Sequence, residues 1–471
     1  MQGFQCRIRS LKLSGHKGDN SKKTNKVLNK ADIFVLAFGA MIGWAWVVMS
    51  GEWIMKAGTL GAVLAFIAGG IVVVFVGQIY AELTSAMSNG QGVLDFTMRG
   101  VGRRFSYIAT WTLMLGYFSV IAFEAVALPN VMVHLFPDYL KIKMYSVAGF
   151  DVHLTWLAIG IGSSVVIAFI NYIGVKIAAT AQTILTIVVA IVGVGLISGG
   201  FINGNAWSIE PLFENGISGF LAVAAMTPFM YVGFDVIPSA SSEMNIPQKK
   251  IGKILLLSVF MAVVWYVLII FGVSIGLSKP ELASSSIATA DAMKNLYSGS
   301  MVASKILICG GIAGILSCWN SFYIGGSRMI LYMAKEGMLP KFLGKIHPKY
   351  KTPSNAIILI AVLTSVAPFL GGNMLTWLVN AGGLAMTVTY LLVSVAFLML
   401  RKKEPEMLRP YKIKRWRFIG IGSIILCFGL SIMYMPGMPS SLTWPYEWAI
   451  ILFWAILGIV LYFGAKKRNI K

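Results

Sequence analysis

The chain has 471 residues, of which 57% are apolar and only 12% are charged, and its mean hydropathy is +0.77. Soluble proteins carry about 25% charged residues, so this composition excludes an ordinary soluble domain and indicates a polytopic membrane protein. The formal net charge of +21 would also suit a nucleic-acid-binding protein, and the positions of the charges must decide between the two.

Twelve apolar stretches follow one another along the chain, and most reach the ~20 residues that a membrane-spanning helix needs. We therefore predict an all-α membrane protein with twelve transmembrane helices. The predicted spans cover roughly residues 32–55, 59–87, 105–135, 153–173, 178–200, 217–241, 251–277, 303–333, 354–370, 375–399, 416–436 and 446–465.

The basic residues lie mainly in every second connection between these spans. With the N-terminus in the cytoplasm, 33 of the 39 lysines and arginines fall on the cytoplasmic side, which is the positive-inside pattern of membrane proteins. The charge therefore predicts that both termini are cytoplasmic, and it argues against nucleic acid as a partner. Residues 1–30 are basic and lack the apolar core of a signal peptide, so we expect a cytoplasmic tail there.

The sequence contains no pattern typical of an enzyme. Its four cysteines, Cys6, Cys309, Cys318 and Cys427, show no paired spacing, and neither a disulfide framework nor a metal site is implied. Nucleophile–base pairs, metal clusters and phosphate-binding loops are not recognisable either. We expect neither catalysis nor a bound cofactor.

Two spans contain residues that interrupt a helix. Span one carries the small residues Gly39, Ala40, Gly43 and Ala45 within 38–46, and span six carries Pro228, Gly233 and Pro238. Proline removes a backbone donor, glycine permits non-helical angles, and a broken helix persists in hydrocarbon only beside protein or a cavity. The alternative is a proline kink that only shapes packing. Interruptions five spans apart favour a transporter built from two inverted repeats.

Several motifs carry a resemblance to a known family. They are YAEL at 80–83, NYIGVK at 171–176, GGSRMILYMAKEGMLP at 325–340, HPKYKTP at 347–353 and RPYK at 409–412. In this order they resemble the amino acid–polyamine–organocation permeases, and the loop after span eight is the most specific of them.

The resemblance implies a transporter core of ten helices over residues 31–400. The core would consist of two inverted five-helix repeats, about 31–200 and 217–400, with helices 1 and 6 broken at mid-membrane. Residues 401–471 would form two C-terminal accessory helices and a short cytoplasmic tail.

The resemblance also places a substrate between the two interruptions. A half-helix N-terminus carries partial positive charge and free N–H groups, which suit a carboxylate, whereas unwound carbonyls suit an ammonium group. The carboxylate would lie on the first interruption and the amine against the second. The implied substrate-binding residues are Ala40, Met41, Ile42, Gly43, Trp44, Phe229, Val232 and Gly233.

Trp44 departs from the family pattern, in which Gly-small-Gly is common at the position of Gly43-Trp44-Ala45. Its ring would narrow the pocket or offer a face to an ammonium group. The alternative is that Trp44 and Trp46 pack against neighbouring helices. The size of the substrate stays open at this point.

Glu124 lies well inside span three, and it shares one helical face with Thr110 and Tyr117 because these residues recur at seven-residue spacing. A carboxylate at mid-bilayer costs at least ~2.5–3.5 kcal/mol, so it is expected to face a partner or water. We predict that Glu124 binds substrate or carries a coupling proton. The alternative is a structural hydrogen bond between helices.

Other residues are candidates for coupling or gating. Asp235 follows the second interruption, where it would belong either to the site or to a helix cap or gate. Glu82 and Arg328 lie near cytoplasmic ends of spans, where an inner gate or a structural role is expected. Proton-linked relatives often carry a lysine in helix five, but here Val189 takes that place. In span eight, the hydroxyls of Ser317 and Ser321 are candidate sodium ligands, or they simply permit close helix packing.

The sequence therefore predicts a plasma-membrane secondary transporter that moves amino acids by alternating access, either coupled to protons or by exchange. The main alternative substrate is an amine without a carboxylate, such as a polyamine or ethanolamine. A less favoured alternative is a nutrient sensor that does not transport. The partners implied are a small molecule, a proton or sodium ion and the lipid bilayer, and the sequence does not indicate an oligomeric state.

Overall fold

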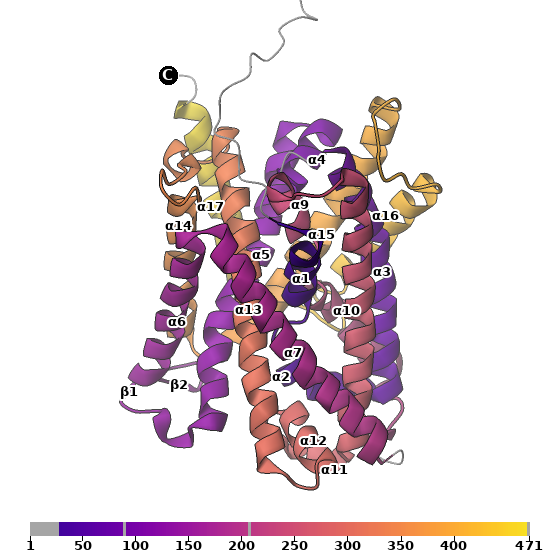
Figure 1. Ribbon diagram of the computed structural model, residues 1–471, viewed down its shortest axis with the longest axis vertical. Coiled ribbons are helices and arrows are strands. Elements are labelled where there is room, and N and C mark those ends of the chain that lie inside the picture. The colour runs from indigo at the N-terminus through magenta and orange to yellow at the C-terminus, as the bar shows by residue number, and fades with distance from the viewer. Residues whose placement is uncertain (1–27, 88–90, 206–208, 469–471) are drawn as a thin grey trace, which may run out of the picture.

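The computed structural model describes residues 28–87, 91–205 and 209–468, and the predicted tail over 1–30 falls almost wholly outside these ranges. The described chain is a helical bundle with one small hairpin (Figure 1). Its α-helices are α1 (Lys30–Met41), α2 (Ala45–Ala57), α3 (Thr59–Ala86), α4 (Val93–Val101), α5 (Arg103–Leu135), α6 (Leu154–Ile173), α7 (Val175–Asn203), α8 (Gly216–Met230), α9 (Val236–Ala240), α10 (Gln248–Gly276), α11 (Lys279–Ser284), α12 (Ala288–Leu296), α13 (Met301–Lys335), α14 (Ser354–Thr364), α15 (Met374–Lys403), α16 (Trp416–Ile432) and α17 (Tyr446–Arg468).

Short elements complete the chain. The 3-10 turns are η1 (Pro137–Tyr139), η3 (Ser241–Glu243), η4 (Lys341–Gly344) and η5 (Ala367–Leu370). Strands β1 (Lys143–Val147) and β2 (Phe150–His153) pair antiparallel with Ser146 opposite Asp151, a hairpin that the apolar pattern did not predict.

Among the described residues, eight helices are long and apolar enough to cross a membrane, or nine if the bent pair α1 and α2 is one span. Three predicted spans are instead shorter apolar helices: α8, α16, and α14 together with η5. Proline and glycine explain two of these. Pro368 lies in the η5 turn after α14, and the chain leaves helical geometry after α8 between Pro228 and Gly233.

Both predicted interruptions are present. Helix α1 ends at Met41 and α2 begins at Ala45, with a bend of 43° between them. Helix α8 ends at Met230 and the short α9 begins at Val236. Between them Gly233 has φ +135°, an angle that side-chain-bearing residues rarely adopt.

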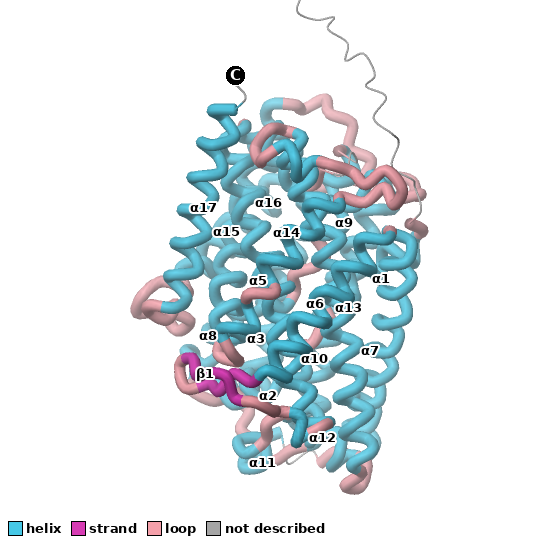
Figure 2. The backbone as a smooth tube through the Cα atoms, turned by 90° about the vertical axis from the view of Figure 1, so that its left-hand side faces the viewer, coloured by secondary structure: helices cyan, strands magenta, loops and turns pink. Residues whose placement is uncertain are grey.

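The interrupted helices lie inside the bundle. Helix α1 packs against α7, α10 and α13, and Figure 1 shows it in the middle of the bundle. Helix α8 packs against α2, α3 and α15, and its residues from Val223 to Met230 are buried. Helix α17 lies at the outer edge (Figure 2). This arrangement satisfies the requirement that non-helical backbone in a membrane protein be surrounded by protein.

Candidate functional site

The two interruptions touch each other. A Cβ atom added at Gly233 would lie 2.6 Å from Cβ of Ala40 and 3.0 Å from the backbone nitrogen of Met41. The contact therefore leaves no space for a side chain at position 233. Glycine is required there twice, once for its backbone angle and once for the close approach of the two chains.

Tyr266 of α10 joins the ends of the two half-helices. Its hydroxyl lies 2.7 Å from the carbonyl oxygen of Met41 and 3.1 Å from that of Met230, so it donates to two carbonyls that have no intrahelical donor. The ring is 1% exposed. Tyr266 was not predicted as a site residue, although a tyrosine deep inside the apolar span 251–277 was a visible signal.

A small cavity of about 20 Å³ lies where the interruptions meet. It contains seven of the nine predicted substrate-binding residues, Ile42 and Gly233 being the exceptions. The N–H of Ile42 already donates to the carbonyl of Phe38, and Gly233 faces α1. The lining residues are Ala40, Met41, Gly43, Trp44, Ala45, Val120, Phe123, Glu124, Phe229, Met230, Val232, Tyr266 and Cys318.

Glu124 is the acidic residue of this cavity. It is 2% exposed, and its Oε1 lies 3.3 Å from the position that a Cβ would take on Gly43. The thiol of Cys318 is its hydrogen-bonding neighbour, whereas Oε2 has no partner among the described residues. Buried carboxyl oxygens in proteins are usually hydrogen-bonded, so Oε2 is available to a further group in the cavity.

The first interruption supplies positive electrostatic potential beside Glu124. Helix α2 begins at Ala45, and its N-cap residue Trp44 makes no side-chain capping bond. The first N–H groups of a helix lack intrahelical acceptors and carry partial positive charge. The Glu124 carboxyl and the positive end of α2 therefore share one wall of the cavity.

Aromatic and aliphatic side chains form the other walls. The ring of Phe229 lies on Gly382 of α15, where an added Cβ would be 2.7 Å from its Cε2, and its centroid is 6.2 Å from that of Phe123. The Trp44 ring packs on Gly311 of α13, at 1.8 Å from an added Cβ. The cavity is thus polar at one end and apolar along its sides.

A hydrogen-bond network occupies the region of the predicted sodium ligands. The Ser317 hydroxyl donates to the carbonyl of Gly39 at 3.2 Å and accepts from Nε2 of Gln182 at 2.7 Å. The Ser321 hydroxyl donates to the carbonyl of Leu36 at 3.2 Å. Gln182 of α7, which was not predicted, places a neutral donor between α13 and α7 close to α1.

Asp235 lies outside the cavity. Its Oδ1 accepts the N–H of Gly233 at 2.9 Å, which holds the non-helical turn, and its side chain makes no capping bond to α9. Three tyrosine hydroxyls interact with it electrostatically, those of Tyr80, Tyr117 and Tyr390. The Tyr117 hydroxyl is its hydrogen-bonding neighbour, whereas the hydroxyls of Tyr80 and Tyr390 have no hydrogen-bond partner among the described residues.

Arg328 is also outside the cavity and forms a buried ion pair. Its Nε and Nη2 donate to the two carboxylate oxygens of Glu243 at 2.7 and 2.9 Å, and its Nη1 donates to the carbonyl of Ile324. The Glu243 carbonyl accepts the N–H of Leu28, and the Leu28 carbonyl accepts the N–H of Asn245. Arg328 thereby ties α13 to η3 and to the segment that leads into α1.

Glu82 holds a different connection. Its Oε2 accepts from Nη2 of Arg401 at 2.6 Å and from the N–H of Ile413 at 2.7 Å, and Oε1 lies 3.1 Å from Nε of Arg409. These contacts fix the connection between α15 and α16 on the end of α3. Of the four coupling or gating candidates, only Glu124 lies at the cavity.

Comparison with known proteins identifies the family of the chain. A model of the amino acid permease family matches residues 28–460. The chain is 26% identical to a branched-chain amino acid permease of Bacillus subtilis, with 100% of this chain and 99% of that protein aligned. It is 26% identical to a methylthioribose transporter of Bacillus subtilis over 95% of both chains, and 26% identical to a histidine permease of Lactococcus lactis over 96% of this chain and 97% of that protein. The chain therefore belongs to the amino acid permeases of the amino acid–polyamine–organocation superfamily.

Proposed function

We propose that the protein imports neutral amino acids across the plasma membrane by alternating access, and that each substrate molecule enters with a proton carried by Glu124. The observation that supports this most directly is the position of the Glu124 carboxyl. It lies beside the positive end of α2 with one oxygen unpaired, inside a cavity that both helix interruptions form.

The proposed coupling follows from electrostatics. A substrate carboxylate bound at the N-terminus of α2 would lie within about 4 Å of an ionised Glu124, and two like charges at that separation repel by about 4 kcal/mol at an effective dielectric constant near 20. Protonation of Glu124 removes this repulsion. A proton and the amino acid would therefore bind together, and each would raise the affinity of the other.

The ammonium group of the substrate would face the carbonyls at the second interruption. Met230 and Met41 end their helices there, and their carbonyl oxygens at present accept from Tyr266. One hydroxyl proton cannot satisfy two carbonyls fully, so an ammonium with three donors is a better partner for this pair. Tyr266 would hold the site in shape between transport cycles.

The walls of the cavity favour an apolar substrate side chain. A cavity of about 20 Å³ accommodates roughly one water molecule, so the walls must separate before an amino acid can enter. The side chains that would then surround the substrate include Val120, Phe123, Phe229 and Val232. This chemistry suits a branched or aromatic amino acid, in keeping with the branched-chain permease among the relatives.

The ion pair between Arg328 and Glu243 would act as an inner gate. It lies at the end of the bundle at which α1 begins, and release of substrate on that side would require η3 and the start of α1 to separate from α13. Breaking it exposes two charges to water, where each regains hydration. Separating the two charges into water therefore costs less free energy than separating them while both stay buried in the protein.

We propose protons rather than sodium as the coupling ion. The two serine hydroxyls that would be sodium ligands donate to carbonyls of α1, and the Gln182 amide donates to Ser317. A cation there would have to displace the Gln182 amide nitrogen. We also propose the finer architecture that the family implies: twelve spans, two inverted five-helix repeats and both termini in the cytoplasm.

Uptake into proteoliposomes tests the proposal. Vesicles containing the purified protein should accumulate leucine when the lumen is more alkaline than the outside, and sodium should have no effect. A matched experiment uses 3-methylbutylamine, which is leucine without its carboxylate. Exchange of internal for external leucine without accumulation would contradict proton coupling while leaving amino acid transport in place.

An amine without a carboxylate is the second candidate substrate, and Glu124 is the observation that favours it. An ionised Glu124 would pair directly with an ammonium group, and no substrate anion would compete for the positive end of α2. In that case 3-methylbutylamine would compete as well as leucine does, and alkaline rather than acidic external pH would favour binding.

A further inference from the structure

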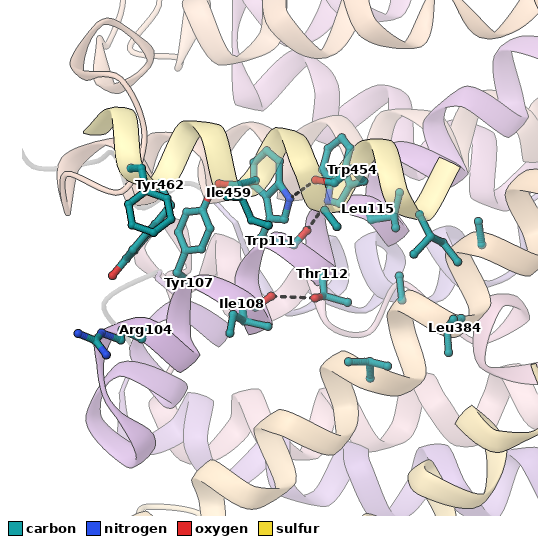
Figure 3. Close-up of a pocket in the computed structure, with 17 residues that line it drawn as sticks. Arg104, Tyr107, Ile108, Trp111, Thr112, Leu115, Leu384, Trp454, Ile459 and Tyr462 are labelled. Carbon is teal, nitrogen blue, oxygen red and sulfur yellow. Dashed lines mark hydrogen bonds between the residues drawn. The ribbon is translucent and has the colours of Figure 1, made fainter. Parts of the chain in front are cut away.

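A long apolar groove lies on the outside of the bundle, away from the transport site. It runs between α5, α15 and α17 (Figure 3), has a volume of about 510 Å³, and is open to the surroundings of the protein. Ile108, Ile459 and Phe463 line it and are 49–62% exposed. We propose that this groove binds one anionic phospholipid, with an acyl chain in the groove and the phosphate on Arg104.

Four polar side chains in the walls, Tyr107, Trp111, Thr112 and Trp454, are already paired with backbone carbonyls. The indole N–H of Trp111 donates to the carbonyl of Trp454 and that of Trp454 to the carbonyl of Trp111, both at 2.9 Å. The Tyr107 hydroxyl donates to the carbonyl of Gly458 at 2.7 Å, and Thr112 bonds within its own helix. These side chains therefore present mainly hydrocarbon to a molecule in the groove. An acyl chain, which consists of methylene groups, has the matching chemistry.

The length of the groove corresponds to one membrane leaflet. On α5 it extends from Arg104 to Leu115, which at 1.5 Å per residue is about 16 Å. On α17 it extends from Phe463 back to Ile451, a similar distance. The hydrocarbon core of a bilayer is about 30 Å thick, so the groove has the depth of a single acyl chain.

Arg104 marks the headgroup end. It is exposed, Figure 3 shows it at the end of the groove, and among the described residues it has no hydrogen-bond or ion-pair partner. The neighbouring Arg103 is already engaged, because it donates to the carbonyl of Glu336 at 2.6 Å. The groove lining contains no acidic residue. A guanidinium at the end of an apolar channel suits a phosphate.

A second copy of the chain fits the groove less well. A symmetric dimer places the same residues on both sides of its axis. With an axis along the membrane normal, two Arg104 side chains would face each other at the same depth with no acidic partner. An anionic lipid neutralises the charge instead.

Native mass spectrometry of the detergent-purified protein, titrated with phosphatidylglycerol or phosphatidylcholine of identical acyl chains, tests the proposal. The wild type should retain phosphatidylglycerol preferentially, and Arg104→Gln should reduce that preference by about fivefold, the factor that corresponds to ~1 kcal/mol per basic residue. Arg417→Gln is the matched control, because Arg417 is exposed but lies on α16 away from the groove.

A second variant tests the acyl chain separately. Ala455 is exposed and lines the groove, so Ala455→Phe should fill it and reduce retention of both lipids, while the melting temperature in lipid-free detergent reports any folding defect. An unchanged lipid preference in Arg104→Gln, or unchanged retention in Ala455→Phe, would overturn the proposal. Dimers that Ala455→Phe dissociates at constant lipid would favour a second copy instead. None of these outcomes depends on transport.

Discussion

Replacing Glu124 by glutamine removes the proposed proton carrier and keeps the shape of the cavity. Glu124 is 2% exposed, its Oε1 lies 3.3 Å from the Cβ position on Gly43, and its Oε2 has no partner among the described residues. A neutral amide therefore fits the same space. It cannot ionise, so it cannot repel a bound carboxylate at any pH.

The repulsion between an ionised Glu124 and the substrate carboxylate determines how strongly leucine affinity depends on pH. Two charges about 4 Å apart at an effective dielectric constant near 20 repel by about 4 kcal/mol, which is roughly a thousandfold in affinity. In the wild type, leucine affinity should therefore fall by about tenfold per pH unit as external pH rises above the value at which free Glu124 ionises, because one proton is bound with each substrate. In Glu124→Gln the affinity should not change with pH.

Two assays separate binding from coupling. Isothermal titration calorimetry of the purified protein between pH 5 and 8 measures the affinity, and uptake by proteoliposomes with an imposed pH gradient measures accumulation. Glu124→Gln should bind leucine and exchange it, but it should not accumulate it. Glu447→Gln is the matched control, because Glu447 of α17 is also buried but pairs with Asn380 and with the N–H of Thr443. Accumulation driven by the pH gradient in Glu124→Gln would refute the reasoning.

Three further substitutions test the site and the gate. Gly233→Ala should lower stability by about 1–3 kcal/mol from backbone strain alone, because φ at this position is +135°. It should also reduce uptake strongly, because the new Cβ would lie 2.6 Å from that of Ala40. Thermal unfolding measures the change in stability, and Gly429→Ala, whose Cβ would meet no atom within 4 Å, is the control expected to be harmless. Tyr266→Phe should lower stability by about 1–3 kcal/mol, because it leaves the buried carbonyls of Met41 and Met230 without a donor. A loss of leucine binding free energy larger than the loss of stability would support a role at the site, whereas equal losses would indicate a purely structural one. Arg328→Gln should destabilise the protein by about 3–5 kcal/mol because it leaves Glu243 buried and unpaired. Adding Glu243→Gln to the same chain should recover part of this loss, and no recovery in the double variant would argue against a coupled pair. Lys56→Gln breaks the exposed pair with Glu52 and, as the control, should change stability by less than about 1 kcal/mol.

The two interruptions and Glu124 were predictable from the sequence, because each gives a signal within its own segment of the chain. Glycine and proline positions indicated both interruptions, because these residues alter backbone geometry wherever they lie in a helix. Glu124 was identifiable because a carboxyl in an apolar span needs a partner. Each of these signals lies within a single segment of the chain. The family resemblance added the residues around the interruptions, and in all, seven of the thirteen lining residues were predicted.

The remaining residues depend on neighbours distant in sequence. Tyr266 bonds to Met41, 225 positions away, and Gln182 bonds to Ser317, 135 positions away. A tyrosine or glutamine in an apolar span has many potential partners, and only helix packing selects one. For the same reason the sequence predicted a gating or structural role for Arg328 without indicating its partner Glu243.

The sequence by itself determined that the chain is an α-helical membrane protein, where its helices are interrupted and which family it resembles. Hydropathy, charge asymmetry and helix-breaking residues act within one segment, so they can be read without knowing what surrounds that segment. Tertiary structure alone decided that the two interruptions enclose one cavity, that Glu124 faces the start of α2 while Asp235 faces tyrosines, and that the serines of α13 bond to α1. Those outcomes depend on which faces of separate helices meet, and packing in three dimensions sets that.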